Sequence, residues 1–250
     1  MRKDIKEFMG HMLESEAELG ETMISVVVDV DDTLINTERR MQGVWRELLG
    51  REVPMEAIET LGLGQIFEKF ASSDQKARAN ELRKRFWDLL LCLENVGIGL
   101  AELDDPIPFA PEVLQKWSKH CLLVYLTGRT ENTRELTLDQ LRKFGFPTDN
   151  IQLVMFNLED YERARGLDPL GSTLVDAKSR LFSSISKQYN VVRVVDDYPG
   201  YFPVYKQFDV LERIGFLRPK KYSVQQFIDR GATRVVESWK QLKDDVPKRT

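Results

Sequence analysis

Short apolar segments alternate with helical patterns along this chain, and this alternation constrains the fold more than any other feature. The segments are five or six residues long and rich in β-branched residues, as strands buried on both faces are. They are residues 24–28, 122–126, 151–156 and 191–195, and the helical patterns cover residues 111–119, 132–144 and 173–189. Strands that alternate with helices predict a parallel sheet, so we expect an α/β, Rossmann-like, three-layer core.

The first two segments are about 90 residues apart, which is too long for a simple connection. Helical patterns fill this interval, and Ser72 and Gln75 have the spacing of a capping box at the start of one of them. We therefore expect a helical cap at residues 36–106, inserted into a core formed by residues 1–35 and 107–250. An apolar stripe also predicts an amphipathic helix at residues 3–19.

Composition excludes several classes of protein. The chain has 36 Lys and Arg against 40 Asp and Glu, so its net charge of -4 supplies no general attraction for nucleic acid or anionic lipid. Its two cysteines and two histidines cannot form a disulfide framework or a Cys/His zinc set, and we expect a reducing cytoplasm. No apolar run approaches the roughly 20 residues of a membrane span, so no membrane partner is expected.

Carboxylates crowd the end of the first strand. Asp29, Asp31 and Asp32 follow it directly, at the carboxyl edge where open α/β sheets bind ligands. Like charges this close are costly without a cation, and hard oxygen ligands favour Mg²⁺. A calcium EF-hand would need Gly and Glu where this chain has Leu34 and Arg40. A simple turn or helix cap is the structural alternative.

Two later strands end in residues that suit an anion and a cation. Thr127, Gly128 and Arg129 follow the second strand and provide a hydroxyl, an open backbone N–H and a guanidinium, ahead of an expected helix N-terminus. The last strand leads to the pair Asp196-Asp197. Lys178, 18 residues before Asp196, lies near the start of the preceding predicted helix and close to the same edge, whereas Lys187 would lie late in that helix.

In residue type, order and strand context, these motifs resemble the haloacid dehalogenase superfamily. The resemblance rests on Asp29, Asp31 and Thr33 in a DxDxT pattern, then on Thr127, Lys178 and the pair Asp196-Asp197. The helical block after the first motif is similar to the family's C1 cap. The resemblance covers residues 24–197 and implies a hydrolase of phosphoric monoesters.

The resemblance also implies a role for each motif residue. Asp29 would be the nucleophile that forms an aspartyl phosphate, and Asp31 the general acid and base, a role that favours a pKa raised toward neutrality. Thr127 and Lys178 would complete the catalytic set. The remaining assignments are substrate binding by Thr33, Gly128 and Arg129, and Mg²⁺ binding by Asp29, the Asp31 carbonyl and the pair Asp196 and Asp197, of which Asp197 aligns better with the usual ligand.

The substrate expected from this resemblance is a phosphorylated small molecule selected by the cap. Arg39 and Arg40 are candidates for contact with an anionic substrate, and Arg129 is a hint of a nucleotide or polynucleotide end. Phosphomutase or phosphonatase chemistry is the alternative within the superfamily. A non-enzymatic phospho-acceptor or metal-binding module, such as a signalling receiver, is the alternative outside the superfamily. The order of residues argues against it, because in receivers the lysine follows the aspartate pair, whereas here Asp196-Asp197 follow Lys178.

Overall fold

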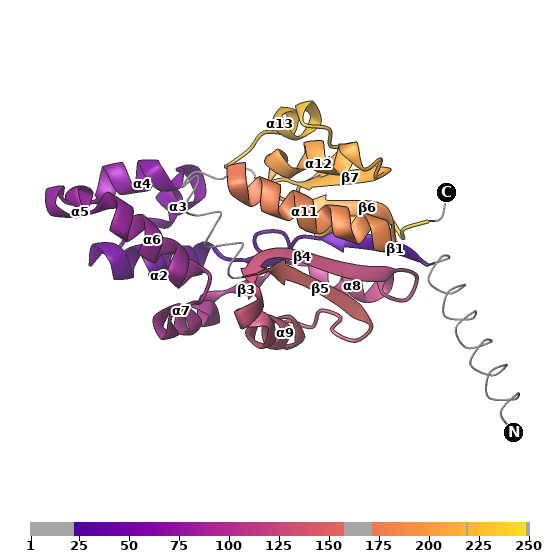
Figure 1. Cartoon of the computed structure of the whole chain (residues 1–250), viewed down its shortest axis with the longest axis horizontal. Helices are drawn as coiled ribbons and strands as arrows, with labels where there is room; N and C mark the ends of the chain where they lie inside the picture. The colour runs from indigo at the N-terminus through magenta and orange to yellow at the C-terminus, as the bar shows by residue number, and fades with distance from the viewer. Residues whose placement is uncertain (1–22, 158–171, 219, 249–250) are drawn as a thin grey trace, which may run out of the picture.

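A parallel sheet of six strands forms the centre of the computed structural model, which describes residues 23–157, 172–218 and 220–248 (Figure 1). The strand order is β5-β4-β1-β6-β7-β8, and every pairing between neighbours is parallel. The strands are β1 (Ile24–Val28), β4 (Leu122–Thr130), β5 (Ile151–Phe156), β6 (Asn190–Asp196), β7 (Glu212–Phe216) and β8 (Arg234–Val236). The predicted α/β class is confirmed.

Helices cover both faces of this sheet and complete the three layers (Figure 1). One face packs α8 (Ala110–Trp117) and α9 (Arg134–Lys143), and the other packs α11 (Ser172–Gln188), α12 (Phe202–Gln207) and α13 (Val224–Asp229). Along β1, Val26 and Val28 belong to the first apolar cluster and Val27 to the second. This alternation explains why four of the five residues of β1 are apolar: helices cover both faces of the strand.

Some boundaries differ from those expected. The second strand does not end at residue 126 but continues to Thr130, with a register shift after Leu126. A turn of 3₁₀ helix, η2 (Glu131–Thr133), then precedes α9. Strand β7 was not expected at all, and beyond β8 the chain forms a short 3₁₀ helix, η4 (Trp239–Leu242).

A block of short helices lies to one side of the sheet (Figure 1). In the sequence it is inserted between β2 and β3, which pair with each other as a small antiparallel ribbon. It has its own apolar cluster, in which the rings of Trp45 and Phe86 lie 4.7 Å apart. Ser72 accepts a hydrogen bond from the Gln75 N–H, as the capping box predicts. The elements are β2 (Ile35–Asn36), α2 (Glu38–Leu49), α3 (Met55–Thr60), α4 (Leu63–Phe70), α5 (Ser73–Ala77), α6 (Ala79–Leu90), α7 (Asn95–Leu100), η1 (Ala101–Leu103) and β3 (Asp105–Pro106).

The helix predicted at residues 3–19 lies outside the described residues. Within the described ranges, none of the helices combines the length and the apolar character that crossing a bilayer requires. Two further segments contribute to the site. One is the loop from Asp29 to Leu34, which follows β1, and the other is the 3₁₀ helix η3 (Pro199–Tyr201), which follows β6.

Candidate active site

The strand order reverses at β1, so the chain leaves β1 and β6 beside a crevice at the carboxyl edge of the sheet. Asp29 follows β1 directly, and its backbone N–H donates to the Val195 carbonyl at 3.0 Å. This bond continues the pairing of β1 with β6 beyond the last residue of β1. It brings Asp29 beside Asp196, the last residue of β6.

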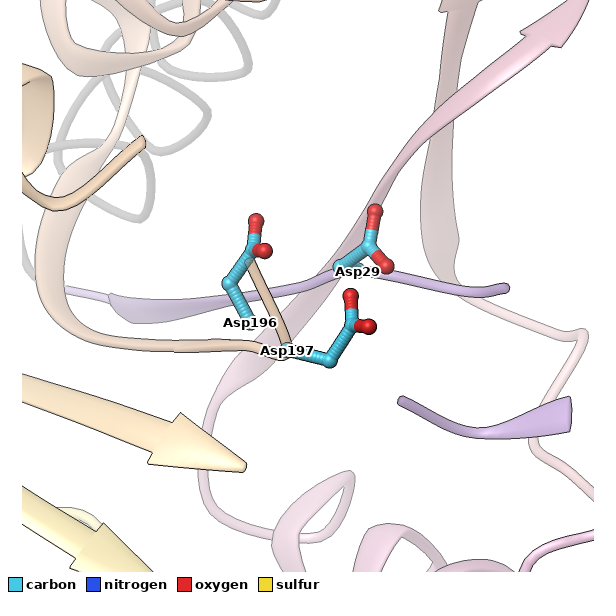
Figure 2. A group of neighbouring side chains, drawn as sticks. All are labelled: Asp29, Asp196 and Asp197. Carbon is cyan, nitrogen blue, oxygen red and sulfur yellow. The ribbon is translucent and has the colours of Figure 1, made fainter. Parts of the chain in front are cut away.

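Three carboxylates meet at this point, those of Asp29, Asp196 and Asp197 (Figure 2). One oxygen from each lies within 4.8 Å of the others, and all three side chains are buried. Burial raises the pKa of Asp29 well above its ordinary value although Lys178 opposes the shift, and the neighbouring aspartates add to it. Burial likewise raises the pKa of Asp197 to about 7, against the charge of Arg218. Such a cluster is costly without a cation, and its oxygen donors fit Mg²⁺.

Lys178 of α11 lies between two of these carboxylates. Its Nζ is 2.6 Å from Asp29 Oδ1 and 2.7 Å from Asp196 Oδ2, and it lies 4.1 Å from the centre of the Tyr201 ring. Burial would lower the pKa of Lys178, but the two aspartates outweigh it and raise the pKa, so the ammonium stays charged. Lys187 is exposed near the far end of α11, so the geometry favours Lys178.

The two consecutive aspartates have different surroundings. Both oxygens of Asp196 accept hydrogen bonds: Oδ2 from Lys178 and from Tyr205 Oη at 2.7 Å, and Oδ1 from the Tyr198 N–H at 2.9 Å. The contact found for the Asp197 carboxylate within the described chain is longer, 3.6 Å from Arg218 Nη1 to Oδ2. Asp197 is therefore the less constrained carboxylate of the pair, while Asp196 anchors Lys178.

Asp31 is held by two buried arginines. Arg40 Nη2 lies 2.8 Å from Asp31 Oδ1, and Arg129 contacts both carboxylate oxygens, with Nη2 at 2.7 Å from Oδ1 and Nε at 3.0 Å from Oδ2. Burial alone would raise the pKa of Asp31, but the charges of Arg129 and Arg40 outweigh it and hold the pKa well below its ordinary range. The expectation of a raised pKa for Asp31 is therefore wrong in this conformation.

The contacts of these arginines bear on their expected roles. Arg40 is only 2% exposed, so it does not face solvent as a contact for an anionic substrate would. Arg129 also donates from Nη1 to Gln140 Oε1 at 2.7 Å, which fixes its guanidinium on the protein. Substrate binding by Arg129 stays a prediction, and its observed contacts instead hold Asp31.

The other predicted residues surround Asp29. Thr33 Oγ1 donates to Asp29 Oδ2 at 3.2 Å, and the Thr33 carbonyl accepts from Trp239 Nε1 at 2.8 Å. Since Val28 pairs with Tyr125, Thr127 and Gly128 lie just beyond Asp29 at the same edge. A Cβ on Gly128 would meet nothing within 4 Å, so its backbone is open. The expected helix N-terminus is not adjacent, because η2 intervenes before α9.

Sequence reasoning missed two residues of this site. Arg218 follows β7 and contacts Asp197, and Tyr205 of α12 contacts Asp196. Neither lies in a recognisable motif. An assignment of β7 would have placed Arg218 at the carboxyl edge, and this was the only signal the sequence contained.

A cavity of about 490 Å³ adjoins the site between the helical insertion and the sheet edge. Asp32 and Arg218 form one wall, and apolar side chains from the β3 and β7 ends form another. The full lining is Asp32, Asn36, Glu38, Glu59, Asp105, Pro106, Ile107, Pro108, Phe216, Leu217, Arg218, Lys220 and Glu237.

Comparison with known proteins identifies the fold. No protein-family model matches the chain, and no curated protein matches it either. Among solved structures, a candidate phosphatase from Clostridium difficile is similar, with a TM-score of 0.61, 17% identity and coverage of 90% of this chain and 99% of that one. A HAD-superfamily hydrolase of subfamily IA from Geobacter sulfurreducens has a TM-score of 0.56 and 12% identity, covering 90% and 97%.

A third similar structure is a HAD family hydrolase from Deinococcus radiodurans with bound phosphate and sodium. Its TM-score is 0.50 and its identity 17%, and the match covers 88% of this chain and 93% of that one. The chain thus has the fold of the haloacid dehalogenase-like hydrolases. The resemblance drawn from the motifs is confirmed at the level of the fold.

Proposed function

We propose that this protein is a Mg²⁺-dependent phosphohydrolase that cleaves phosphomonoesters through an aspartyl phosphate on Asp29. The observation that supports this most is the position of Lys178 between Asp29 and Asp196, with Asp197 beside them. A buried carboxylate that must attack an anionic phosphate needs nearby positive charge to reduce repulsion. Lys178 supplies one such charge.

A divalent cation would supply the rest. The buried donors Asp29 and Asp197 fit Mg²⁺, together with the backbone carbonyl of Asp31 that the resemblance implies. When bound there, Mg²⁺ would neutralise charge between the nucleophile and the phosphoryl oxygens. The hydrogen bonds already made by Asp196 favour a supporting role for that residue, as the anchor of Lys178.

The proposed reaction has two halves. Asp29 attacks phosphorus, the Asp29 O–P bond forms, and the bond to the leaving oxygen breaks as that oxygen takes a proton. Water then attacks the aspartyl phosphate, loses a proton to Asp31, and releases phosphate and free Asp29. The arginine pair keeps Asp31 ionised, as a base for the second half must be. To donate the first proton, Asp31 must be protonated, so its contacts with the arginines must loosen in the substrate complex.

The remaining groups suit phosphate binding. Thr127 and the open Gly128 backbone lie at the same edge, and we propose that they bind phosphoryl oxygens. We propose that the adjoining cavity receives the leaving group of a phosphorylated small molecule, and that residues 36–106 act as the cap that selects it. The buried, unbridged thiols of Cys92 and Cys121 fit a reducing compartment such as the cytoplasm.

The test is hydrolysis of p-nitrophenyl phosphate with Mg²⁺ or with EDTA. We expect metal-dependent release of phosphate by the wild type. Asp29→Asn should lower this rate by at least about a thousandfold with an unchanged circular dichroism spectrum. Asp74→Asn, an exposed position of α5, is the matched control and should retain full activity. A fully active Asp29→Asn variant would contradict the nucleophile assignment, and a folded, Mg²⁺-bound wild type that cleaves no phosphomonoester in a broad screen would contradict the function.

A further inference from the structure

Arg218 joins three segments of the chain at the edge of the carboxylate cluster. Its Nη1 contacts Asp32 in the loop after β1 and lies 3.6 Å from Asp197 Oδ2 in the loop after β6. Its Nη2 lies 3.0 Å from Glu38 Oε1 in the first turn of α2. The side chain is 10% exposed, so these contacts are made away from bulk water.

The partner of Arg218 in the first loop is itself fixed. Asp32 has a φ of 64°, in the left-handed region, which an aspartate adopts more readily than most residues. Its Oδ1 accepts hydrogen bonds from the Thr37 N–H at 3.1 Å and from Thr37 Oγ1 at 2.7 Å. Asp32 Oδ2 is the atom that Arg218 contacts, so the guanidinium rests on a carboxylate that is already held at the start of α2.

Asp197 depends more heavily on such support than its neighbour does. Asp196 is oriented by Lys178, Tyr205 and a backbone N–H, whereas Asp197 has the longer contact with Arg218, and the charge of Lys221 also acts on it. Repulsion from Asp29 and Asp196 acts to turn Asp197 away from the cluster. The guanidinium opposes that rotation, since it pairs with Asp197 from the side of Asp32 and Glu38.

We propose that Arg218 is a positioning residue for the cation site, which holds Asp197 in place to bind Mg²⁺ and ties that ligand to the first turn of α2. This inference rests on the proposed function. The inference can be distinguished from a simple charge effect, because Arg218 is itself a positive charge close to the proposed cation. If only charge mattered, its removal would strengthen Mg²⁺ binding; if positioning dominates, its removal weakens it.

The experiment is titration calorimetry of the purified full chain with MgCl₂. We expect Arg218→Met to weaken Mg²⁺ binding at least tenfold, and Arg218→Lys, which keeps the charge but lacks the planar fork, at least threefold. Lys243→Met is the matched control: it removes an exposed positive charge outside the cavity lining, where Lys243 lies 3.6 Å from Glu112 of α8. Its dissociation constant should stay within twofold of the wild type.

A second readout separates positioning from a structural role. Urea unfolding with and without Mg²⁺ measures how much bound cation stabilises each variant, since a ligand of the native state adds to its stability. Positioning predicts a smaller Mg²⁺-dependent increment in Arg218→Met, while a purely structural role lowers both values equally. If Arg218→Met does not fold, Arg218→Lys decides by the same two criteria.

The outcomes distinguish the inference from the function on which it rests. Wild type that binds Mg²⁺, together with Arg218 variants that bind it equally or more tightly, would overturn the positioning role alone. A folded wild type that shows no Mg²⁺ binding would overturn the proposed cation site, and the role of Arg218 with it.

Discussion

Arg40 Nη2 lies 2.8 Å from Asp31 Oδ1, so a helix of the insertion directly holds an aspartate of the loop after β1. The same guanidinium reaches Asp104 through Nε at 3.2 Å, just before the chain returns to the core. One buried arginine thus pairs with residues at the beginning and the end of the insertion. The position of helix α2 and the state of Asp31 are therefore coupled through this side chain.

Arg40→Met should destabilise the protein. The variant removes one of the two buried cations that Asp31 and Asp104 share, the other being Arg129, and breaking a buried ion pair typically costs about 3–5 kcal/mol. Urea unfolding measures this loss in the free energy of unfolding. Arg39→Met is the control, because Arg39 and its partner Asp105 are both 60% exposed and such pairs contribute about 1 kcal/mol or less. Equal losses for the two variants would contradict the bridging role of Arg40.

Asp104 should make stability depend on pH. Burial raises its pKa to about 6, although Arg40 opposes the shift. Between about pH 4 and 6 the folded state then binds more protons at this group than the unfolded state, so its contribution to the free energy of unfolding falls as pH rises. The slope is at most about 1.4 kcal/mol per pH unit, and above this window the contribution is constant.

Asp104→Asn removes this dependence. Urea unfolding of wild type and variant at pH 4.5, 5.5 and 7 should show the variant gaining relative to the wild type as pH rises to 6. Subtraction of the two curves cancels the titration of other groups that the substitution leaves unaffected. A difference that stays constant across this range would show that Asp104 has no raised pKa.

The sequence predicted the parts of this fold that depend on local pattern. Strands β1 and β5 have the expected bounds, because both are mostly apolar: β1 is buried throughout, and β5 is buried at Leu153, Met155 and Phe156. Strand β7 was missed because it begins with the charged residues Glu212 and Arg213, and only its last three residues are buried. A short strand near the edge of the sheet shows no continuous apolar run.

The residues of the candidate site likewise differ in how far the sequence predicts their positions. Lys178 could be placed because a strand, a helix and a second strand follow one another in sequence, so its distance from Asp196 fixes its end of the helix. The burial of Arg40 could not be predicted from the sequence. It depends on how α2 leans on the core, and on Leu90 and Cys92, some 50 residues further along the chain, which accept its hydrogen bonds. No local pattern contains that information.

Lys178→Met should abolish most turnover. The ammonium balances the charge of Asp29 and lies where a phosphoryl group would approach, so its loss is expected to lower kcat by about 10²–10³. Lys187→Met, an exposed position on the same helix, should stay within twofold of the wild type. Steady-state hydrolysis of p-nitrophenyl phosphate measures both variants, and equal activities would remove Lys178 from the mechanism.

Tyr205→Phe should lower the free energy of unfolding more than it lowers kcat, because the Tyr205 hydroxyl orients Asp196 without taking part in the reaction. Tyr205 is buried and its hydroxyl donates to Asp196 Oδ2 at 2.7 Å, so the substitution deletes one hydrogen bond to a charged acceptor and leaves the ring in place. The expected loss in the free energy of unfolding is about 1.5–3 kcal/mol. Lys178 still holds Asp196 in this variant, so kcat should fall less than tenfold.

Tyr201→Phe is the control for this prediction, since it keeps the ring that lies against Lys178. Its free energy of unfolding should change by less than about 1 kcal/mol in urea titrations run beside those of Tyr205→Phe. If Tyr205→Phe is as stable as Tyr201→Phe, then Asp196 does not need the Tyr205 hydroxyl. Its orientation would then depend on Lys178 and the Tyr198 N–H alone.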